Sequence, residues 1–169
     1  MEYRIETRET FRIVGKPLRV TMAGGAGDLE DKASISRFWE AAMKDGSLEA
    51  IGRLMKQGAG LGVMGACIPS EDPRSAAFTY LIAVEVEAGQ AGFPEGWIDL
   101  TIPASNWAVF PCRGPIPESI QSTWPRIMAE WFPTSGYERV PAPDLEVYPA
   151  EDPAHPEIHA EIWVPIGKK

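Results

Sequence analysis

The chain has 169 residues, of which 44% are hydrophobic and 24% charged, a composition typical of a globular protein with one sizeable core. Its net charge of −8 and its lack of a basic stripe argue against nucleic-acid binding, because a nucleic-acid-binding protein has to neutralise phosphates. No apolar run approaches the ~18 residues of a membrane span, and the two cysteines and two histidines match no metal-ligand spacing, so we expect a cytoplasmic protein without metal or cofactor.

The first half of the chain begins with a strand and a glycine-rich connection. Residues 3–15 alternate between polar and apolar side chains, which predicts a half-buried strand. Gly15, followed by Lys16-Pro17, is expected to break this strand as a bulge. Residues 21–30 lack both phosphate-binding glycine patterns, so a flexible connection is the better interpretation.

Two helices and two strands are expected next. Asp31 is the predicted N-cap of a helix that ends at Gly46, and Ser47 is the predicted cap of a second, shorter helix. The first helix has a stripe with the spacing of a buried face: Ile35, Phe38, Trp39 and Ala42. Apolar runs at 61–67 and 76–87 predict two strands.

The second half repeats this order. Residues 97–112 predict a strand that Pro103 interrupts, and residues 114–133 predict a helix that Pro133 ends. Pro125 lies inside this helix, where a missing N–H is expected to kink it. The helix has its own buried stripe: Ile120, Trp124, Ile127 and Trp131. Strands are predicted at 145–148 and 158–166.

The two halves also share sequence details. FRIVG at 11–15 resembles WAVFP at 107–111, and RFWEAAM at 37–43 resembles RIMAEWF at 126–132. We therefore predict an α+β fold made of two βαββ repeats, about 1–90 and about 91–169, related by a pseudo-twofold axis within a single domain. Each repeat would form an antiparallel sheet with one main helix, and a central ligand cleft would lie where the repeats meet.

A family resemblance supports this interpretation. The stretch LTIPASNWAVFPCRGPIPESIQSTWPRIMAEWFPTSGYERVPAPDLEVYP, followed by EIHAEIWVPI, resembles the GyrI-like small-molecule-binding family, which includes effector-binding domains of AraC-type and MerR-type multidrug regulators. FRIVG, the helix with Phe38-Trp39 and the strand FTYLIAVEV fit the same pattern, so the resemblance covers nearly the whole chain. It implies a stand-alone copy of a domain that binds bulky aromatic cations in a central cleft.

The last strand gives the main candidate residue. Ile158, Ala160, Ile162 and Val164 share one side, which is expected to lie under a helix. Glu161 and Trp163 share the other side, and a carboxylate beside a ring suits a hydrophobic cation. By resemblance, Glu161 matches the family position whose carboxylate faces the bound cation. The alternative is a solvated glutamate on an edge strand.

Further residues are predicted to line the cleft. Tyr80 is expected to meet Glu161 across the groove, or else to be a core tyrosine. Glu146 and Tyr148 share a face and would form a second wall, although Glu146 also fits a surface charge. Trp107 and Phe110 face opposite sides of their strand, so only one can line the cleft, and Trp131 is the helical tryptophan that could reach it. Trp39 and Trp124 are expected in the core.

Three functions follow from these residues. The first is binding of a small, hydrophobic, cationic molecule, without contact to nucleic acid or membrane. The second, implied by resemblance, is hydrolysis of cyclopropane-containing antibiotics, with Glu161 as general base and Tyr80 as hydrogen-bond donor. The third, implied by the family's resemblance to a DNA gyrase inhibitor, is binding of a protein partner such as DNA gyrase through an acidic surface.

Overall fold

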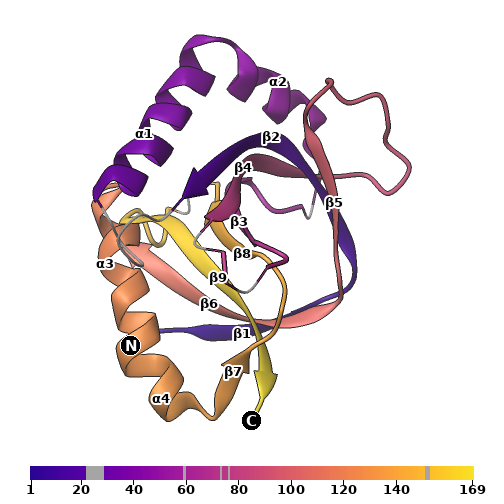
Figure 1. Cartoon of the computed structure of the whole chain (residues 1–169). Helices are drawn as coiled ribbons and strands as arrows, with labels where there is room; N and C mark the ends of the chain where they lie inside the picture. Colours follow the sequence, from indigo (N-terminus) through magenta and orange to yellow (C-terminus); the bar gives the residue numbers. More distant parts are fainter. Residues whose placement is uncertain (22–28, 59, 73, 76, 151–152) are drawn as a thin grey trace.

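The computed structural model describes residues 1–21, 29–58, 60–72, 74–75, 77–150 and 153–169, without the side chains of residues 29–33. Residues 22–28 of the predicted glycine-rich connection lie outside the described residues. Within them, the strands are β1 (Arg4–Arg8), β2 (Phe11–Thr21), β3 (Val63–Pro69), β4 (Ala77–Val86), β5 (Ile98–Ile102), β6 (Ser105–Arg113), β7 (Tyr137–Arg139), β8 (Asp144–Tyr148) and β9 (Ile158–Lys168). They form one curled sheet (Figure 1).

The strand order shows how the two halves are joined. The order is β1-β6-β9-β8-β3-β4-β2-β5, with β7 on β9, and each pairing is antiparallel. β3 and β8 meet at the centre of the sheet. Outward from them, the first half continues with β4, β2 and β5, and the second half continues with the corresponding strands β9, β6 and β1. The predicted α+β architecture with two related βαββ units is confirmed, with the two sheets joined edge to edge through β3 and β8.

Two predicted strands are each divided in the structure. The segment predicted as one strand at 3–15 forms β1, which pairs with β6, and β2, which pairs with β4 and β5. The segment 97–112 likewise divides into β5 and β6 near Pro103. Each division lets the chain cross from one half of the sheet to the other, so β1 extends the second half and β5 extends the first.

Gly15 does not end its strand as a bulge, because β2 continues to Thr21. Gly15 pairs in regular register with Ala83 on one side and Ile98 on the other. A Cβ at this position would lie 2.3 Å from the carbonyl oxygen of Ile82, closer than any real contact. Glycine is therefore required here because the neighbouring strand comes too close for a side chain. A glycine inside a strand can indicate either a bulge or such a close approach, and the sequence pattern did not distinguish them.

The helices lie outside the curl of the sheet (Figure 1). They are α1 (Leu29–Lys44), α2 (Ser47–Leu54), α3 (Glu118–Arg126), the π-helical segment η1 (Ile127–Trp131) and α4 (Phe132–Ser135). Asp31 lies inside α1 instead of capping it. Ser47 is the first residue of α2 and does not cap it: the N-cap is Gly46, and the N–H of Ser47 donates to the carboxylate of Asp45.

The second-half helix shows what its two inner prolines do. Pro125 lies in α3, and the π-helical segment begins two residues later, as expected when a proline removes a backbone hydrogen bond. Pro133 does not end the helix, because it falls in the first turn of α4, where its missing N–H is tolerated. In the described part of the chain, no helix is both long and apolar enough to cross a membrane.

Apolar side chains of the described residues form three cores, one inside the curl and two under helices. The inner core draws on strands of both halves and includes Leu81, Trp107, Leu145 and Trp163. The second core lies under α3 and η1 and contains Ala160, Ile162 and Val164, as the alternation on the last strand predicted. The third core lies under α1 and α2 and includes Tyr80. The sheet thus has an inner face and a helix-covered face.

Candidate functional site

Glu146 lies at the centre of the sheet, on the strand that joins the second half to the first. It is opposite Gly65 of β3 and Ile162 of β9. Its neighbours Leu145 and Val147 belong to the inner core, so Glu146 points to the helix-covered face. Gly65 has no side chain, and the hydroxyl of Tyr80 occupies that space: a Cβ there would lie 2.0 Å from the hydroxyl oxygen.

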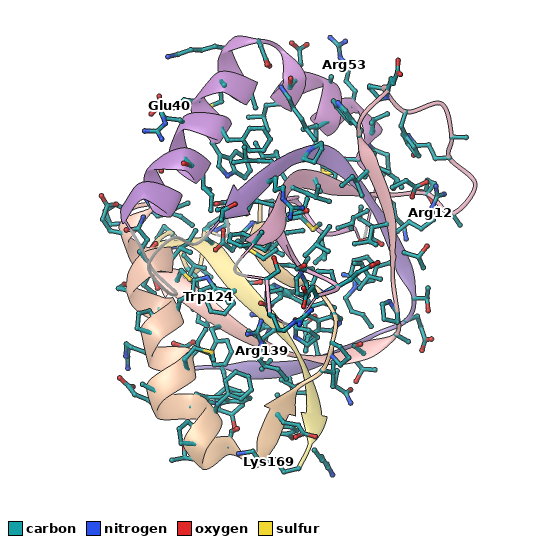
Figure 2. All side chains as sticks on the ribbon, viewed as in Figure 1. Arg12, Glu40, Arg53, Trp124, Arg139 and Lys169 are labelled. Carbon is teal, nitrogen blue, oxygen red and sulfur yellow. The ribbon has the colours of Figure 1, made fainter. Side chains whose placement is uncertain are left out.

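Hydrogen bonds connect Glu146 to both halves of the protein. The Tyr80 hydroxyl donates to Oε2 at 3.3 Å, and Nε1 of Trp124 on α3 donates to Oε1 at 3.0 Å. Nε1 of Trp39 on α1 in turn donates to the Tyr80 hydroxyl at 2.9 Å. Figure 2 labels Trp124 between α3 and the sheet. A chain of neutral donors therefore runs from α1 through β4 and β8 to α3.

Aromatic rings surround the carboxylate. The ring of Trp39 contacts that of Tyr148 edge to face, with centroids 5.2 Å apart. Trp39, Trp124, Tyr148 and Glu146 are partly exposed, whereas Tyr80 is fully buried. The four partly exposed side chains remain within reach of a ligand, and they offer both apolar area and π faces.

The charge of Glu146 is poorly compensated. Burial raises the pKa of Glu146, and the hydrogen bonds from Trp124 and Tyr80 lower it by less. Within the described residues, Glu146 has no ion pair with a lysine or arginine. Burial, together with the nearby Glu146 carboxylate, also raises the pKa of Tyr80 and Tyr148, so both phenols stay protonated. The site is a partly buried acid held by neutral groups, an arrangement that favours an incoming positive charge.

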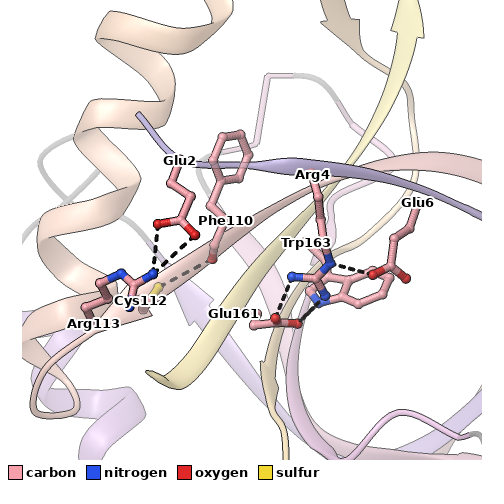
Figure 3. A network of polar contacts seen from close by, with 8 residues as sticks. All are labelled: Glu2, Arg4, Glu6, Phe110, Cys112, Arg113, Glu161 and Trp163. Carbon is pink, nitrogen blue, oxygen red and sulfur yellow. Dashed lines mark hydrogen bonds and ion pairs between the residues drawn. The ribbon is translucent and has the colours of Figure 1, made fainter. Parts of the chain in front are cut away.

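Glu161 lies on the opposite, inner face of the sheet beside Trp163, as the alternation predicted. Both of its carboxylate oxygens accept hydrogen bonds from Arg4 of β1, at 2.6 and 2.9 Å (Figure 3). Nε1 of Trp163 donates to Oε2 at 3.0 Å, and the Arg4 guanidinium lies 5.7 Å from the Trp163 ring centroid. The side chain of Glu161 is 13% exposed and borders a cavity of about 380 Å³ that Tyr3 and His155 also line.

The structure does not bring Tyr80 and Glu161 together, so the predicted contact between them is wrong. Tyr80 is on β4 and Glu161 is on β9, with β3 and β8 between these strands. The two side chains also point to opposite faces of the sheet. Tyr80 instead donates a hydrogen bond to Glu146, a residue predicted from the sequence to form a second wall of the cleft with Tyr148.

The other predicted lining residues are in the cores. Trp107 is fully buried in the inner core, and Phe110 is fully buried under α3, so they do face opposite sides. Trp131 is packed edge to face on Phe110, with ring centroids 5.1 Å apart, and is 5% exposed. Sequence reasoning assigned Trp39 and Trp124 to the core alone. Their positions on helical stripes gave the correct face, but no pattern signals that their indole N–H groups reach an acid and a phenol.

A second carboxylate lies on the same face as Glu146. Asp144 is two residues earlier on β8, opposite Cys67 of β3, and is 7% exposed. Arg139 of β7 donates to its Oδ2. Burial raises the pKa of Asp144 to about 6, Arg139 opposes that rise, and the charge of Glu146 adds to it. Burial and the two acids also raise the pKa of Cys67, so its thiol stays protonated.

Comparison with known proteins identifies the family. The model of the family Cass2, integron-associated effector binding protein, matches residues 4–166. The chain belongs to this family. The GyrI-like resemblance is thereby confirmed, and effector binding, meaning binding of a small molecule, is the class of activity that the family carries. The search of curated proteins returned no match.

Solved structures share the fold over nearly the whole chain. SAV2435 bound to tetraphenylphosphonium is 23% identical with a TM-score of 0.79, covering 99% of this chain and 94% of that one. The integron cassette protein VCH_CASS2 from Vibrio cholerae is 18% identical with a TM-score of 0.67, covering 98% and 95%. The C-terminal domain of EcmrR is 16% identical with a TM-score of 0.59, covering 99% and 98%. At these identities the comparisons show the fold.

Proposed function

We propose that this member of the Cass2 family binds a lipophilic organic cation on the helix-covered face, with Glu146 as the central acid. The observation that carries the proposal is a partly buried carboxylate, at the junction of the two halves, to which the described residues supply only neutral donors. A bound cation would supply the missing countercharge, and the surrounding rings would supply apolar contact and cation–π attraction.

The ligand of a relative supports this choice of chemistry. SAV2435, which has the same fold, was solved with tetraphenylphosphonium, a cation whose charge is surrounded by aromatic rings. Tetraphenylphosphonium has no N–H group, so it cannot be held by hydrogen bonds to an acid. A site for such a cation needs a carboxylate in apolar surroundings, and Glu146 with Trp39, Trp124 and Tyr148 has this composition.

Glu161 is the alternative acid, as the sequence suggested. Its carboxylate already receives the guanidinium of Arg4 in a two-point ion pair. A ligand would have to displace Arg4 before it could pair with Glu161, and it would lose two charge-assisted hydrogen bonds in doing so. Glu161 therefore serves as the matched control for Glu146.

The test is a calorimetric titration of tetraphenylphosphonium into the wild-type protein, Glu146→Gln and Glu161→Gln. Glu146→Gln keeps the shape of the side chain and removes its charge, so we expect the affinity to fall about 100-fold, which corresponds to about 2.7 kcal/mol. Glu161→Gln should bind within about threefold of wild type. The proposal fails if Glu146→Gln binds as wild type does, or if Glu161→Gln shows the larger loss.

One observation favours a second function at the same site. An acid with a raised pKa beside a phenol hydroxyl is also the arrangement of a general base and a hydrogen-bond donor. Here Glu146, and not the predicted Glu161, would activate water, and the fully buried Tyr80 would hold the Glu146 carboxylate in place through its hydroxyl. Turnover of a cyclopropane-containing substrate that Glu146→Gln abolishes would support hydrolysis; absence of turnover across several such substrates would leave binding alone.

A further inference from the structure

Asp144 has one carboxylate oxygen that is buried and lacks a hydrogen bond. Its Oδ2 accepts from Arg139, while its Oδ1 has no partner in the described part of the chain. Buried acceptors are rarely left without a donor, because the lost hydration is not replaced. Arg139 therefore donates to only one of the two carboxylate oxygens in the described structure, and Oδ1 is able to accept from another donor.

The position of Asp144 relates it to the Glu146 site. The two acids are two residues apart on β8, so they share the helix-covered face at a Cα separation of about 7 Å. Gly65 and Cys67 are opposite them on β3, and neither has a side chain long enough to separate the two carboxylates. The two acids thus form a row along one strand.

Arg139 is held loosely compared with Asp144. It belongs to β7, a strand of three residues whose one partner among the described strands is β9, and its side chain is 44% exposed. A partly exposed guanidinium on a short edge strand can adjust its position at little cost in free energy. Asp144 can therefore accept a donor from a ligand either through the free Oδ1 or in place of Arg139.

We propose that Asp144 is a second polar subsite of the Glu146 site and selects lipophilic cations that carry an additional N–H donor. This inference rests on the proposed function. The charged ring system of the ligand would pair with Glu146, while an amino group on that ring system would donate to Asp144. Amino-substituted aromatic cations have this chemistry, whereas tetraphenylphosphonium and simple N-alkylated aromatic cations lack the second donor.

The experiment compares two probes that differ by two ring amino groups: N-methylacridinium and its diamino derivative, acriflavinium. Fluorescence titrations are run at pH 8, where Asp144, with a pKa of about 6, is ionised. Wild type should bind the diamino probe about tenfold more tightly, as expected for a hydrogen bond to a charged acceptor. Asp144→Asn should reduce this preference to about twofold or less and leave the affinity for N-methylacridinium within about threefold.

Two further variants separate the possible causes. Asp72→Asn removes an exposed acid elsewhere on the surface and should leave the preference as in wild type. Glu146→Gln should weaken the binding of both probes. If wild type binds neither probe, the proposed function fails and the subsite fails with it. If wild type binds both probes, and Asp144→Asn keeps the preference or weakens both equally, the subsite alone is refuted.

Arg139→Gln keeps the inference testable if Asp144→Asn does not fold. This variant leaves Asp144 in place and removes its competing donor. We expect the preference for the diamino probe to increase at least threefold, because Asp144 would then have no arginine to share its oxygens. An unchanged preference in Arg139→Gln would overturn the proposal.

Discussion

Glu146 and Glu161 lie on neighbouring strands, and each accepts a hydrogen bond from a tryptophan, yet they differ in what balances their charge. On the inner face, Glu161 receives a guanidinium from the same chain. On the helix-covered face, the described part of the chain gives Glu146 only an indole N–H and a phenol hydroxyl. An acid beside an aromatic ring is thus not sufficient to indicate a cation site. What distinguishes the two faces is whether the protein already provides the cation.

The largest effect is expected from adding a side chain at Gly65, the residue opposite Glu146 on β3. In Gly65→Ala the new Cβ would lie 2.0 Å from the Tyr80 hydroxyl oxygen, and Tyr80 is fully buried and has no space to retreat into. We expect the affinity for tetraphenylphosphonium to fall at least tenfold and Tm to fall by about 5 °C or more, since overpacking costs about 1–3 kcal/mol.

Gly52→Ala in α2 is the matched control, because no atom lies within 4 Å of its new Cβ. Alanine is favoured over glycine in a helix, so Tm should stay equal or rise slightly. Calorimetric titration and thermal melting of both variants give the comparison. Wild-type affinity in Gly65→Ala would show that the contact between Tyr80 and Glu146 does not take part in binding.

The pH dependence of binding sharpens the contrast between the two acids. Because burial raises the pKa of Glu146, part of the unliganded protein carries a protonated Glu146 near that pKa. A cation binds the ionised form, so affinity should increase as pH rises through the raised pKa and should level off above it, by about tenfold per pH unit below it. Protons should be released on binding, which titrations in two buffers of different ionisation enthalpy would measure. Affinity independent of pH from 4 to 8 would contradict the assignment.

The smallest effects expected are changes in Tm, and they should have opposite signs for the two acids. A folded-state pKa above the unfolded value means that the folded protein binds the proton more tightly, so Glu146 costs stability as pH rises through its pKa. Glu146→Gln should therefore raise Tm at pH 8 by about 2–4 °C, roughly the effect of 1 kcal/mol in a chain of this length.

Glu161→Gln should lower Tm by a similar amount, because it leaves Arg4 without its two-point partner. The gain in Glu146→Gln should disappear near pH 4, where the wild-type carboxyl is protonated. Thermal melting at the two pH values measures both variants. A fall in Tm for Glu146→Gln at pH 8 would mean that the charge of Glu146 is already compensated in the free protein.

Local patterns in the sequence predicted which side of an element each residue faces. The alternation on β9 placed Ile162 with the helix-covered core and Trp163 with the inner core, because successive side chains on a strand point to opposite faces. The helical spacing likewise placed Trp39 and Trp124 toward the sheet. These predictions rest on backbone geometry alone, which is why they are confirmed.

The composition of the site could not be predicted in the same way. Whether Tyr80 meets Glu146 or Glu161 depends on the order of strands in the sheet, and that order is fixed by pairing between residues far apart in the sequence. The partner of Glu161 is Arg4, which is 157 positions away on β1, a strand from the start of the chain that pairs within the second half of the sheet. No periodicity in the sequence indicates such a contact, so the two acids could not be ranked without the structure.

The most direct test of the account is a crystal structure of the protein with tetraphenylphosphonium. We expect the phosphonium to lie on the helix-covered face with Glu146 as the nearest carboxylate, its phenyl rings against Trp39, Trp124 and Tyr148, and the ion pair between Arg4 and Glu161 intact. A cation bound in the cavity beside Glu161, with Arg4 displaced, would contradict the account.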